Sequence, residues 1–261
     1  MSRRWLKEKR KDHYYRKAKS EDYRSRASYK LKQLNRRFGL IKKGDAVLDL
    51  GAAPGGWMQV AGEAVGDTGI VVGVDLAGIK PFKEENLITL QGDITKEETI
   101  ERIRAVQETF NAVICDASPD ISGAWDIDHF NSVELGRHAL RMAGQVLREG
   151  GSFLVKVFQG SLLKEFEGEV KREFEFVKVA KPKASRKESS EVYIVAKGLL
   201  KTPVRYGDIL EVEITEQGRR PGEGIAYVDG YRVIVEDGQV GEKTRVRIKK
   251  ATRRAAWGVK V

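Results

Sequence analysis

Short apolar runs alternate with helical patterns between residues 25 and 174 of the chain. Residues 25–38 carry apolar side chains at helical spacing and lead to Gly39, a helix stop. The apolar runs predict strands at 46–50 (AVLDL), 69–75, 87–90, 112–116 and 152–158 (SFLVKVF), and the segments between them predict helices at 57–65, 96–106, 127–147 and 162–174. This alternation predicts an α/β fold with a parallel sheet covered on both faces.

Two further strands, at 176–180 and 191–196 (EVYIVA), depart from the alternation. The segment between them contains the basic sequence KPKASRKES, and no helix fits into it. A connection between two parallel strands needs a longer crossover, usually a helix. The pair is therefore predicted to form an antiparallel hairpin at one end of the sheet.

The pattern changes at about Lys201, where apolar and polar residues begin to alternate with a period near two. Segments such as ILEVEI, GIAYV, YRVIVE and TRVRIKKA, separated by turn residues, are typical of a small β-barrel. A β-rich extension of the main sheet is the alternative, but the break at KGLLKTP and a shift in charge favour a separate domain. We expect a loose basic arm over 1–23, an α/β domain over 24–200 and a β-barrel over 201–261.

Composition narrows the class of protein. Apolar residues make up 41% of 261 residues, enough to bury a core. No stretch approaches the roughly 18 apolar residues that a membrane helix needs, and no apolar segment follows the basic N-terminus as in a secretory signal. One cysteine, Cys115, excludes an internal disulfide and a cysteine-cluster metal site, and His13, His129 and His138 lack ligand spacing. We expect a soluble cytoplasmic protein without a metal.

Charge is unevenly distributed along the chain. Residues 1–37 contain 15 Lys and Arg against 4 Asp and Glu, residues 38–200 contain 20 against 25, and residues 201–261 contain 13 against 9. Two basic ends therefore flank a mildly acidic centre, and basic ends attract phosphate backbones. A solvated basic tail is the alternative. The first segment, however, also carries aromatic residues that suit base stacking, so a nucleic-acid partner is favoured. These are Trp5, Tyr14, Tyr15, Tyr23 and Tyr29.

A glycine-rich turn with the sequence DLGAAPGG follows the first strand and opens a helix, so its backbone can approach a ligand closely. It is neither a G-x-G-x-x-G fingerprint nor a P-loop. Asp75, Asp93 and Asp116 end the next three strands, at the edge of the sheet where such folds bind ligands. Carboxylates repel a phosphate-rich cofactor, whereas S-adenosylmethionine offers them a ribose, an adenine amino group and a positive charge.

Lys156 lies inside the apolar run SFLVKVF. If its apolar neighbours face one side of the sheet, the lysine faces the other, where it needs a partner. A lysine at the exposed end of the strand is the alternative. For Glu191 the alternative is a paired surface residue, and for Lys30 it is a solvated basic helix face. Spacing alone therefore singles out none of the three.

Six segments occur in a familiar order over residues 24–198: SRASYKL, DLGAAPGGW, QGD, CDASPD, FLVKVF and SEVYIVAKG. In this order they resemble the FtsJ-like ribose 2'-O-methyltransferases, also called the ribosomal large-subunit methyltransferase E group. Residues 201–261 resemble a TRAM domain, a small RNA-binding β-barrel that archaeal members often carry. The resemblance implies a Rossmann-like class I methyltransferase sheet with an antiparallel C-terminal hairpin, followed by this OB-like barrel.

The resemblance also implies site residues. A tetrad around the reactive ribose hydroxyl falls on Lys30, Asp116, Lys156 and Glu191. Lys156 is the implied proton acceptor, Asp116 holds it while facing the sulfonium, and the other two position the ribose and the base. S-adenosylmethionine is the implied cofactor, and its sulfonium is electrophilic enough to need no metal. The family's cofactor contacts fall on Gly55, Trp57, Asp75, Asp93 and Asp116.

The implied activity is methylation of the ribose 2'-oxygen of a uridine in large-subunit (23S) ribosomal RNA, by a monomer that binds this RNA or the assembled large subunit. Relatives with nearly the same core modify transfer RNA anticodon loops or messenger RNA caps, so a transfer RNA substrate is an alternative. A non-catalytic RNA-binding assembly factor is an alternative from another class, although the intact tetrad argues against it. The SRASYKL and SEVYIVAKG matches and the TRAM-like tail favour ribosomal RNA.

Overall fold

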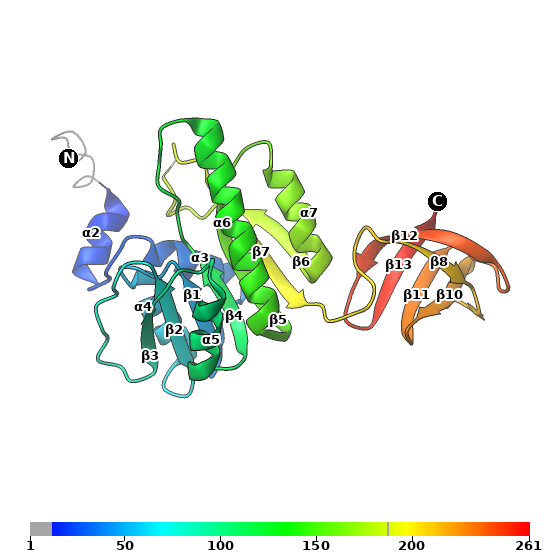
Figure 1. Ribbon diagram of the computed structural model, residues 1–261, viewed down its shortest axis with the longest axis horizontal. Coiled ribbons are helices and arrows are strands. Elements are labelled where there is room, and N and C mark those ends of the chain that lie inside the picture. Colours follow the sequence, from blue (N-terminus) through cyan, green and yellow to red (C-terminus); the bar gives the residue numbers. More distant parts are fainter. Residues whose placement is uncertain (1–11, 187) are drawn as a thin grey trace.

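A seven-stranded, mostly parallel sheet forms the larger part of the molecule (Figure 1). The computed structural model describes residues 12–186 and 188–261; residues 1–11, with Trp5 of the expected basic arm, lie outside the described residues. The strands are β1 (Ala46–Leu50), β2 (Ile70–Asp75), β3 (Leu87–Gln91), β4 (Phe110–Cys115), β5 (Leu147–Phe158), β6 (Phe174–Ala180) and β7 (Glu191–Leu199). Their order is β3-β2-β1-β4-β5-β7-β6, with β7 antiparallel to both of its neighbours. The predicted Rossmann-like sheet and its terminal hairpin are confirmed.

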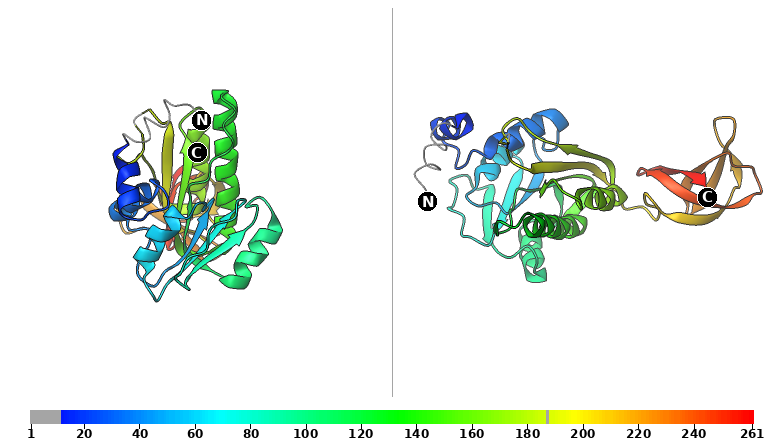
Figure 2. Two further views of the ribbon diagram at one scale, coloured as in Figure 1. Left: turned by 90° about the vertical axis from the view of Figure 1, so that its left-hand side faces the viewer. Right: turned by 90° about the horizontal axis from the view of Figure 1, so that it is seen from above.

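Helices cover both faces of the sheet and enclose two apolar cores (Figure 2). One face carries α3 (Ser28–Phe38) and α4 (Gly56–Val65), and the other carries α5 (Glu97–Val106), α6 (Trp125–Val146) and α7 (Leu163–Glu173). Consecutive residues of β1 point to opposite cores: Val47 belongs to the core under α3 and α4, and Leu48 to the other. Within the described residues, no helix combines the length and the apolar composition that crossing a bilayer requires.

The N-terminal segment contains a helix, α2 (His13–Ser20), where the sequence pattern predicts a loose arm. Asp12 caps this helix by accepting a hydrogen bond from the Tyr15 backbone N–H at 3.2 Å. Tyr14 packs on Tyr29 of α3 with 5.4 Å between ring centroids. The expectation of a loose arm is wrong for this helix, because aromatic packing on α3 stabilises a short segment that is strongly polar overall.

β5 begins earlier than the sequence pattern predicts. The pattern places its start at Ser152 and uses Glu149-Gly150-Gly151 to close the preceding helix. In the structure α6 ends at Val146, and Leu147 pairs at once with Phe110 of β4. A register shift follows this pair, and Gly150 adopts a φ of 77°. The glycines therefore accommodate an irregular strand rather than a helix end.

A curled sheet of six strands forms the C-terminal barrel (Figure 1). Its strands are β8 (Ile209–Glu213), β9 (Glu216–Gln217), β10 (Glu223–Val228), β11 (Tyr231–Glu236), β12 (Lys243–Ala251) and β13 (Ala255–Lys260). Val233, Val246 and Ile248 are fully buried in its core. The predicted barrel is confirmed, but the alternation does not reveal β13, because its sequence AAWGVK places small residues side by side.

Ion pairs connect the barrel to the edge of the first sheet. Arg205 pairs with Glu173 at the end of α7, and Arg253 Nε lies 3.3 Å from Glu175 Oε1 of β6. These side chains are partly exposed, so each pair contributes little stability in water. Their effect is on position, because they hold the barrel next to the start of β6.

Gly73 of β2 allows a close contact between the sheet and α4. A Cβ at this position would lie 2.2 Å from the sulfur of Met58, a fully buried side chain of α4. Gly73→Ala is expected to lower the free energy of unfolding by about 1–3 kcal/mol through overpacking. Met58→Ala should lower it by about 2–5 kcal/mol through the cavity it leaves. The methyl group added at residue 73 would fill part of that cavity. The double variant should therefore lose roughly 1 kcal/mol less free energy of unfolding than the two single variants together. Urea unfolding of all three variants measures the difference.

Gly144→Ala is the matched control for this pair. Gly144 lies in the last turn of α6, and a Cβ built there meets no atom within 4 Å apart from its chain neighbours and the backbone of its own helix. Its replacement should raise the free energy of unfolding by about 0.5–1 kcal/mol, because alanine favours a helix interior. Strictly additive losses at residues 58 and 73 would show that the two side chains do not share this space.

Candidate active site

The glycine-rich turn after β1 lies directly against the neighbouring strands. The backbone N–H groups of Gly51 and Ala52 both donate to the Val74 carbonyl, at 2.8 and 3.0 Å. Gly51 has a φ of 73°, and a Cβ there would lie 2.5 Å from the Cβ of Ala117. Residue 51 therefore has no room for a side chain, and the turn abuts the segment that carries Asp116.

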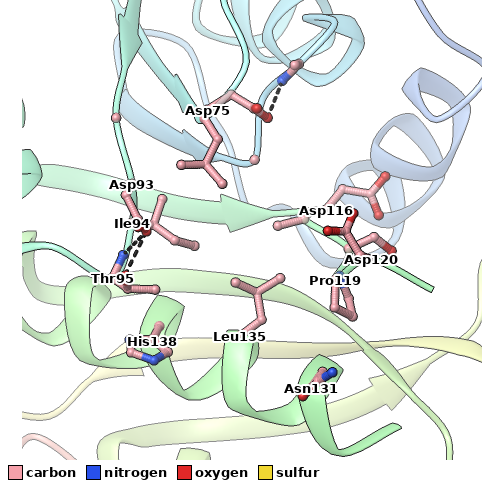
Figure 3. A pocket seen from close by; sticks show the side chains of 16 residues that line it. Asp75, Asp93, Ile94, Thr95, Asp116, Pro119, Asp120, Asn131, Leu135 and His138 are labelled. Carbon is pink, nitrogen blue, oxygen red and sulfur yellow. Dashed lines mark hydrogen bonds between the residues drawn. The ribbon is translucent and has the colours of Figure 1, made fainter. Parts of the chain in front are cut away.

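A cleft of about 690 Å³ opens at the carboxyl edge of the sheet, and three predicted carboxylates lie around it (Figure 3). Asp75 at the end of β2, Asp93 after β3 and Asp116 after β4 all line it. Other lining residues include Gly51, Ala53, Thr95, Pro119, Asn131 and His138. The described residues hold no group of three or more His, Cys, Asp or Glu that could bind a metal ion. A cleft with this lining suits a ligand with hydroxyl groups, amino groups and positive charge.

Two of the carboxylates are oriented by nearby donors. The oxygens of Asp75 accept hydrogen bonds from the backbone N–H groups of Ala53 and Ala77, at 2.9 and 2.8 Å. Asp93 Oδ1 accepts from the N–H and the hydroxyl of Thr95, at 2.9 and 2.8 Å. These two bonds lower the pKa of Asp93, so its carboxylate stays ionised. Each carboxylate retains lone pairs for a ligand.

Gly55 and Trp57, the two other implied cofactor contacts, do not line this cleft. The Trp57 side chain is 3% exposed, and its indole N–H donates to the Ala27 carbonyl at 2.8 Å. Gly55 has a φ of 106° and is the N-cap of α4. The Gly55 N–H already donates to the Ala52 carbonyl at 2.6 Å, so of these two positions only Trp57 can offer a ligand its backbone N–H, in the first turn of the helix. The tryptophan ring is a core group that connects the turn to α3.

Asp49 of β1 is a buried carboxyl group that the sequence analysis did not single out. It is fully buried, and neither oxygen has a hydrogen-bond partner in the part of the chain that the structure describes. Burial raises the pKa of Asp49 well above its usual range, and the charges of Asp116 and Asp75 raise it further. A buried polar group without a partner is unusual, and this one lies close enough to Asp75 and Asp116 of the cleft for their charges to act on it. An acidic residue inside the apolar run AVLDL was the available signal.

Four predicted residues from different elements form one compact cluster of opposite charges. Lys30 Nζ of α3 lies 2.8 Å from Glu191 Oε2 and 3.9 Å from Asp116 Oδ1. Lys156 Nζ of β5 donates to the Asp116 carbonyl at 2.7 Å and lies 3.4 Å from its carboxylate and 3.9 Å from Glu191 Oε1. The two lysines are only 8% and 6% exposed. The surface alternatives for these lysines are therefore wrong, since each is buried between two carboxylates.

Tyr193 belongs to the same cluster and was missed. Its hydroxyl donates to Asp116 Oδ1 at 2.7 Å, and Lys30 Nζ lies 5.7 Å from its ring centroid. Burial raises the pKa of Tyr193 well above its usual value, as do the nearby carboxylates, so the phenol stays protonated and remains a donor. The missed signal is the period of two in EVYIVA, which places Glu191 and Tyr193 on one face of β7.

A second cleft, of about 360 Å³, also borders the cluster. Lys30 and Glu191 line it together with Arg26, before α3, and Arg186, in the loop between β6 and β7. Asp116 lines the first cleft instead. The lysine–carboxylate cluster therefore lies where an acidic cleft and a cleft with two arginines meet. A group exchanged between two ligands, one in each cleft, would be transferred at this cluster.

Comparisons with known proteins give the family of the chain. The profile of the family described as FtsJ-like methyltransferase matches residues 23–199, and that of the TRAM domain matches residues 203–261. The chain is 53% identical over 248 residues to the "Ribosomal RNA large subunit methyltransferase E" of Methanothrix thermoacetophila. This match covers 95% of each chain. It is 46% identical over 253 residues to the protein of the same name from Halorubrum lacusprofundi, covering 96% of this chain and 94% of the relative.

A solved structure shares the fold of the larger domain. It is a Plasmodium falciparum protein described as a ribosomal RNA methyltransferase, with a TM-score of 0.62 and 29% identity. The match covers 68% of this chain and 98% of that one, so the neighbour corresponds to the seven-stranded sheet with its helices.

Glu191 should make stability depend on pH. Burial raises the pKa of Glu191, but the ammonium groups of Lys30 and Lys156 outweigh burial and leave it below its usual value. A carboxylate with a depressed pKa in the folded state stabilises the fold above the unfolded pKa, and this contribution is lost as pH falls through the folded value. Glu191→Gln should therefore lower the free energy of unfolding by roughly 1–3 kcal/mol at pH 7. The deficit should shrink below about pH 4.

Glu188→Gln is the matched control, because the same chemical change is made at an exposed residue of the adjoining loop. Denaturant unfolding of both variants and the wild type between pH 3.5 and 8 measures the difference. A Glu191→Gln deficit that stays constant over this range would contradict the role of the charge.

Proposed function

Since the chain belongs to the FtsJ-like methyltransferase family, we propose that it methylates the ribose 2'-oxygen of a uridine in large-subunit ribosomal RNA, with S-adenosylmethionine as the methyl donor. The observation that carries the proposal is the buried cluster of two lysines and two carboxylates where the two clefts meet. The names of the relatives support ribosomal RNA of the large subunit as the substrate.

The first cleft fits S-adenosylmethionine. The carboxylates of Asp75 and Asp93 can accept hydrogen bonds from the ribose hydroxyls and the adenine amino group. The orphaned carboxyl group of Asp49 gives a cationic amino group a partner, and the Trp57 backbone N–H in the first turn of α4 suits a carboxylate. Bound there, the cofactor supplies a methyl group on a positively charged sulfur.

Lys156 takes the proton of the ribose 2'-hydroxyl in the proposed reaction, which requires its amine to be neutral at that moment. The hydroxyl is a weak nucleophile until this proton leaves. The Asp116 carbonyl holds Nζ of Lys156 at 2.7 Å, and Tyr193 in turn fixes the Asp116 carboxylate. The pair of Lys30 and Glu191 lines the second cleft, where it orients the ribose for in-line attack.

The barrel holds RNA away from the chemistry in this proposal. Exposed basic residues follow one another along β12, and Lys250 Nζ lies 5.2 Å from the centroid of the Trp257 ring. Rings beside cations suit stacked bases and their phosphates. Residues 24–200 then transfer the methyl group and residues 201–261 bind RNA. A monomer suffices, because one chain supplies the whole tetrad, and it works in the cytoplasm with its RNA.

Lys156→Ala should abolish methyl transfer without loss of cofactor binding. Removing an acid–base group typically costs about 100- to 10,000-fold in rate. The assay follows tritium from labelled S-adenosylmethionine into an in vitro transcript of large-subunit ribosomal RNA, with transfer RNA alongside. Nuclease mapping then locates the 2'-O-methylated nucleotide. Methylation of transfer RNA alone would overturn the proposed substrate, and no transfer to either RNA by the wild type would overturn the proposed activity.

Asp75→Ala is the complementary variant, and it tests cofactor binding. It should weaken binding of S-adenosylhomocysteine by about 1–3 kcal/mol, because ligand hydroxyls lose their acceptor, as measured by calorimetry. Lys156→Ala should bind this ligand as the wild type does. A loss of affinity in Lys156→Ala as large as its loss of rate would refute the proton-acceptor role.

A triple substitution, Arg247→Ala, Lys249→Ala and Lys250→Ala, tests the barrel in the full-length chain. Fewer counterions would be released on RNA binding, so the plot of log affinity against log salt should become less steep by roughly 1–2. Affinity for S-adenosylhomocysteine should stay unchanged, since no proposed cofactor contact lies in the barrel. Filter binding across a salt series measures both slopes, and equal slopes would mean that this strand does not contact RNA.

A further inference from the structure

The second cleft contains two arginines that the proposed chemistry does not use. Arg26 and Arg186 line this cleft beside Lys30 and Glu191 of the tetrad. Both arginines lie in segments that the sequence analysis quoted, SRASYKL and KPKASRKES, without giving them a role. The cleft therefore contains cations that do not belong to the proton-transfer machinery.

The two arginines differ in how far their charge is already compensated. The Arg26 side chain is 19% exposed, forms an ion pair with Asp12 and donates to the Ala184 carbonyl at 2.5 Å. The Arg186 side chain is 55% exposed, and its Nε lies 3.8 Å from the same Asp12 carboxylate. The single negative charge of Asp12 is therefore shared between two guanidinium groups. Burial lowers the pKa of Arg26, and the nearby charge of Arg186 lowers it further, which is consistent with excess positive charge here.

The position of Arg186 is defined by its neighbours in the loop. Ala184, two residues earlier, is fully buried, and its N–H donates to Gln33 of α3 at 3.0 Å. Its carbonyl accepts the hydrogen bond from Arg26. The loop is thus attached to α3 immediately before Arg186. Among the described residues that line this cleft, Glu188 is the one carboxylate outside the tetrad, and it is exposed to solvent.

The chemistry of RNA places a phosphate close to any 2'-hydroxyl, because the next ribose carbon carries the 3'-phosphodiester. A hydroxyl at Lys156 therefore brings a phosphate to the cleft that Lys30 and Glu191 line. Glu191 already compensates Lys30 at 2.8 Å, and Asp12 compensates Arg26. The geometry points to Arg186 as the residue that binds the phosphodiester adjoining the target ribose, with Arg26 and Asp12 supporting its position. This inference rests on the proposed function and adds an RNA subsite to it.

Arg186→Ala should raise the dissociation constant for a large-subunit ribosomal RNA transcript about tenfold, as expected for losing a hydrogen-bonded charge. The slope of log affinity against log salt should become less steep by about 1. Arg186→Lys keeps the charge and should restore the slope, with only part of the affinity. The kcat/KM for methyl transfer should fall about as much as the RNA affinity, because the residue binds RNA and takes no proton.

Arg148→Ala is the matched control. It removes the same charge from an exposed residue near the start of β5, at the opposite end of the strand from the tetrad. Filter binding does not depend on turnover, so it decides on Arg186 even if the wild type fails to methylate this RNA. If the wild type methylates the RNA and Arg186→Ala binds it as tightly as Arg148→Ala does, the subsite is overturned and the proposed function still stands.

A modified RNA tests where the phosphate lies. Once the methylated nucleotide is mapped, a fragment with a neutral methylphosphonate at its 3'-phosphate should bind the wild type about tenfold more weakly than the unmodified fragment. Binding by Arg186→Ala should not weaken further, because the contact is already absent. Equal weakening of both proteins would place this phosphate elsewhere and overturn the inference.

Discussion

The site depends on one electrostatic constraint: two lysines that are less than a tenth exposed must be compensated in the same small volume. An isolated buried ammonium is strongly disfavoured, so Asp116 and Glu191 have to lie within a few ångströms of both. The four residues come from α3, the end of β4, β5 and β7. These elements can meet only if the sheet, its crossover helices and its terminal hairpin are all in place. Formation of the cluster and completion of the fold are therefore coupled.

The inserted strand β7 is what closes this cluster. A sheet that ended at β5 would leave Lys156 at an edge, next to solvent. Antiparallel pairing sets Lys156 opposite Tyr193 and Phe158 opposite Glu191. Tyr193 can then reach Asp116, and Glu191 can reach both lysines from the end of the strand. A parallel strand in this position would begin at the other edge of the sheet and would bring different residues to the site.

The sequence predicts the parts of this molecule that follow local rules. Apolar runs and a glycine-rich turn are enough to place five parallel strands, the hairpin and three carboxylates at one edge. The features that the sequence does not predict depend on contacts between distant segments. Tyr14 of α2 packs on Tyr29, and Trp57 is buried in the core under α3, where its indole N–H finds the Ala27 carbonyl. Lys30 and Lys156 look ordinary until α3 and β7 meet, and only the family resemblance singled them out beforehand.

The hairpin of β6 and β7 also relates the two RNA-binding regions proposed above. β6 starts beside the barrel, where Glu175 contacts Arg253, and it leads at Ala180 into the loop that carries Arg186 (Figure 1). Its seven residues span roughly 20 Å at about 3.3 Å per residue. An RNA held by both the barrel and Arg186 therefore extends over several nucleotides. Phosphate contacts so far apart select the shape of a folded RNA, so the active site itself needs few contacts with the base that it modifies.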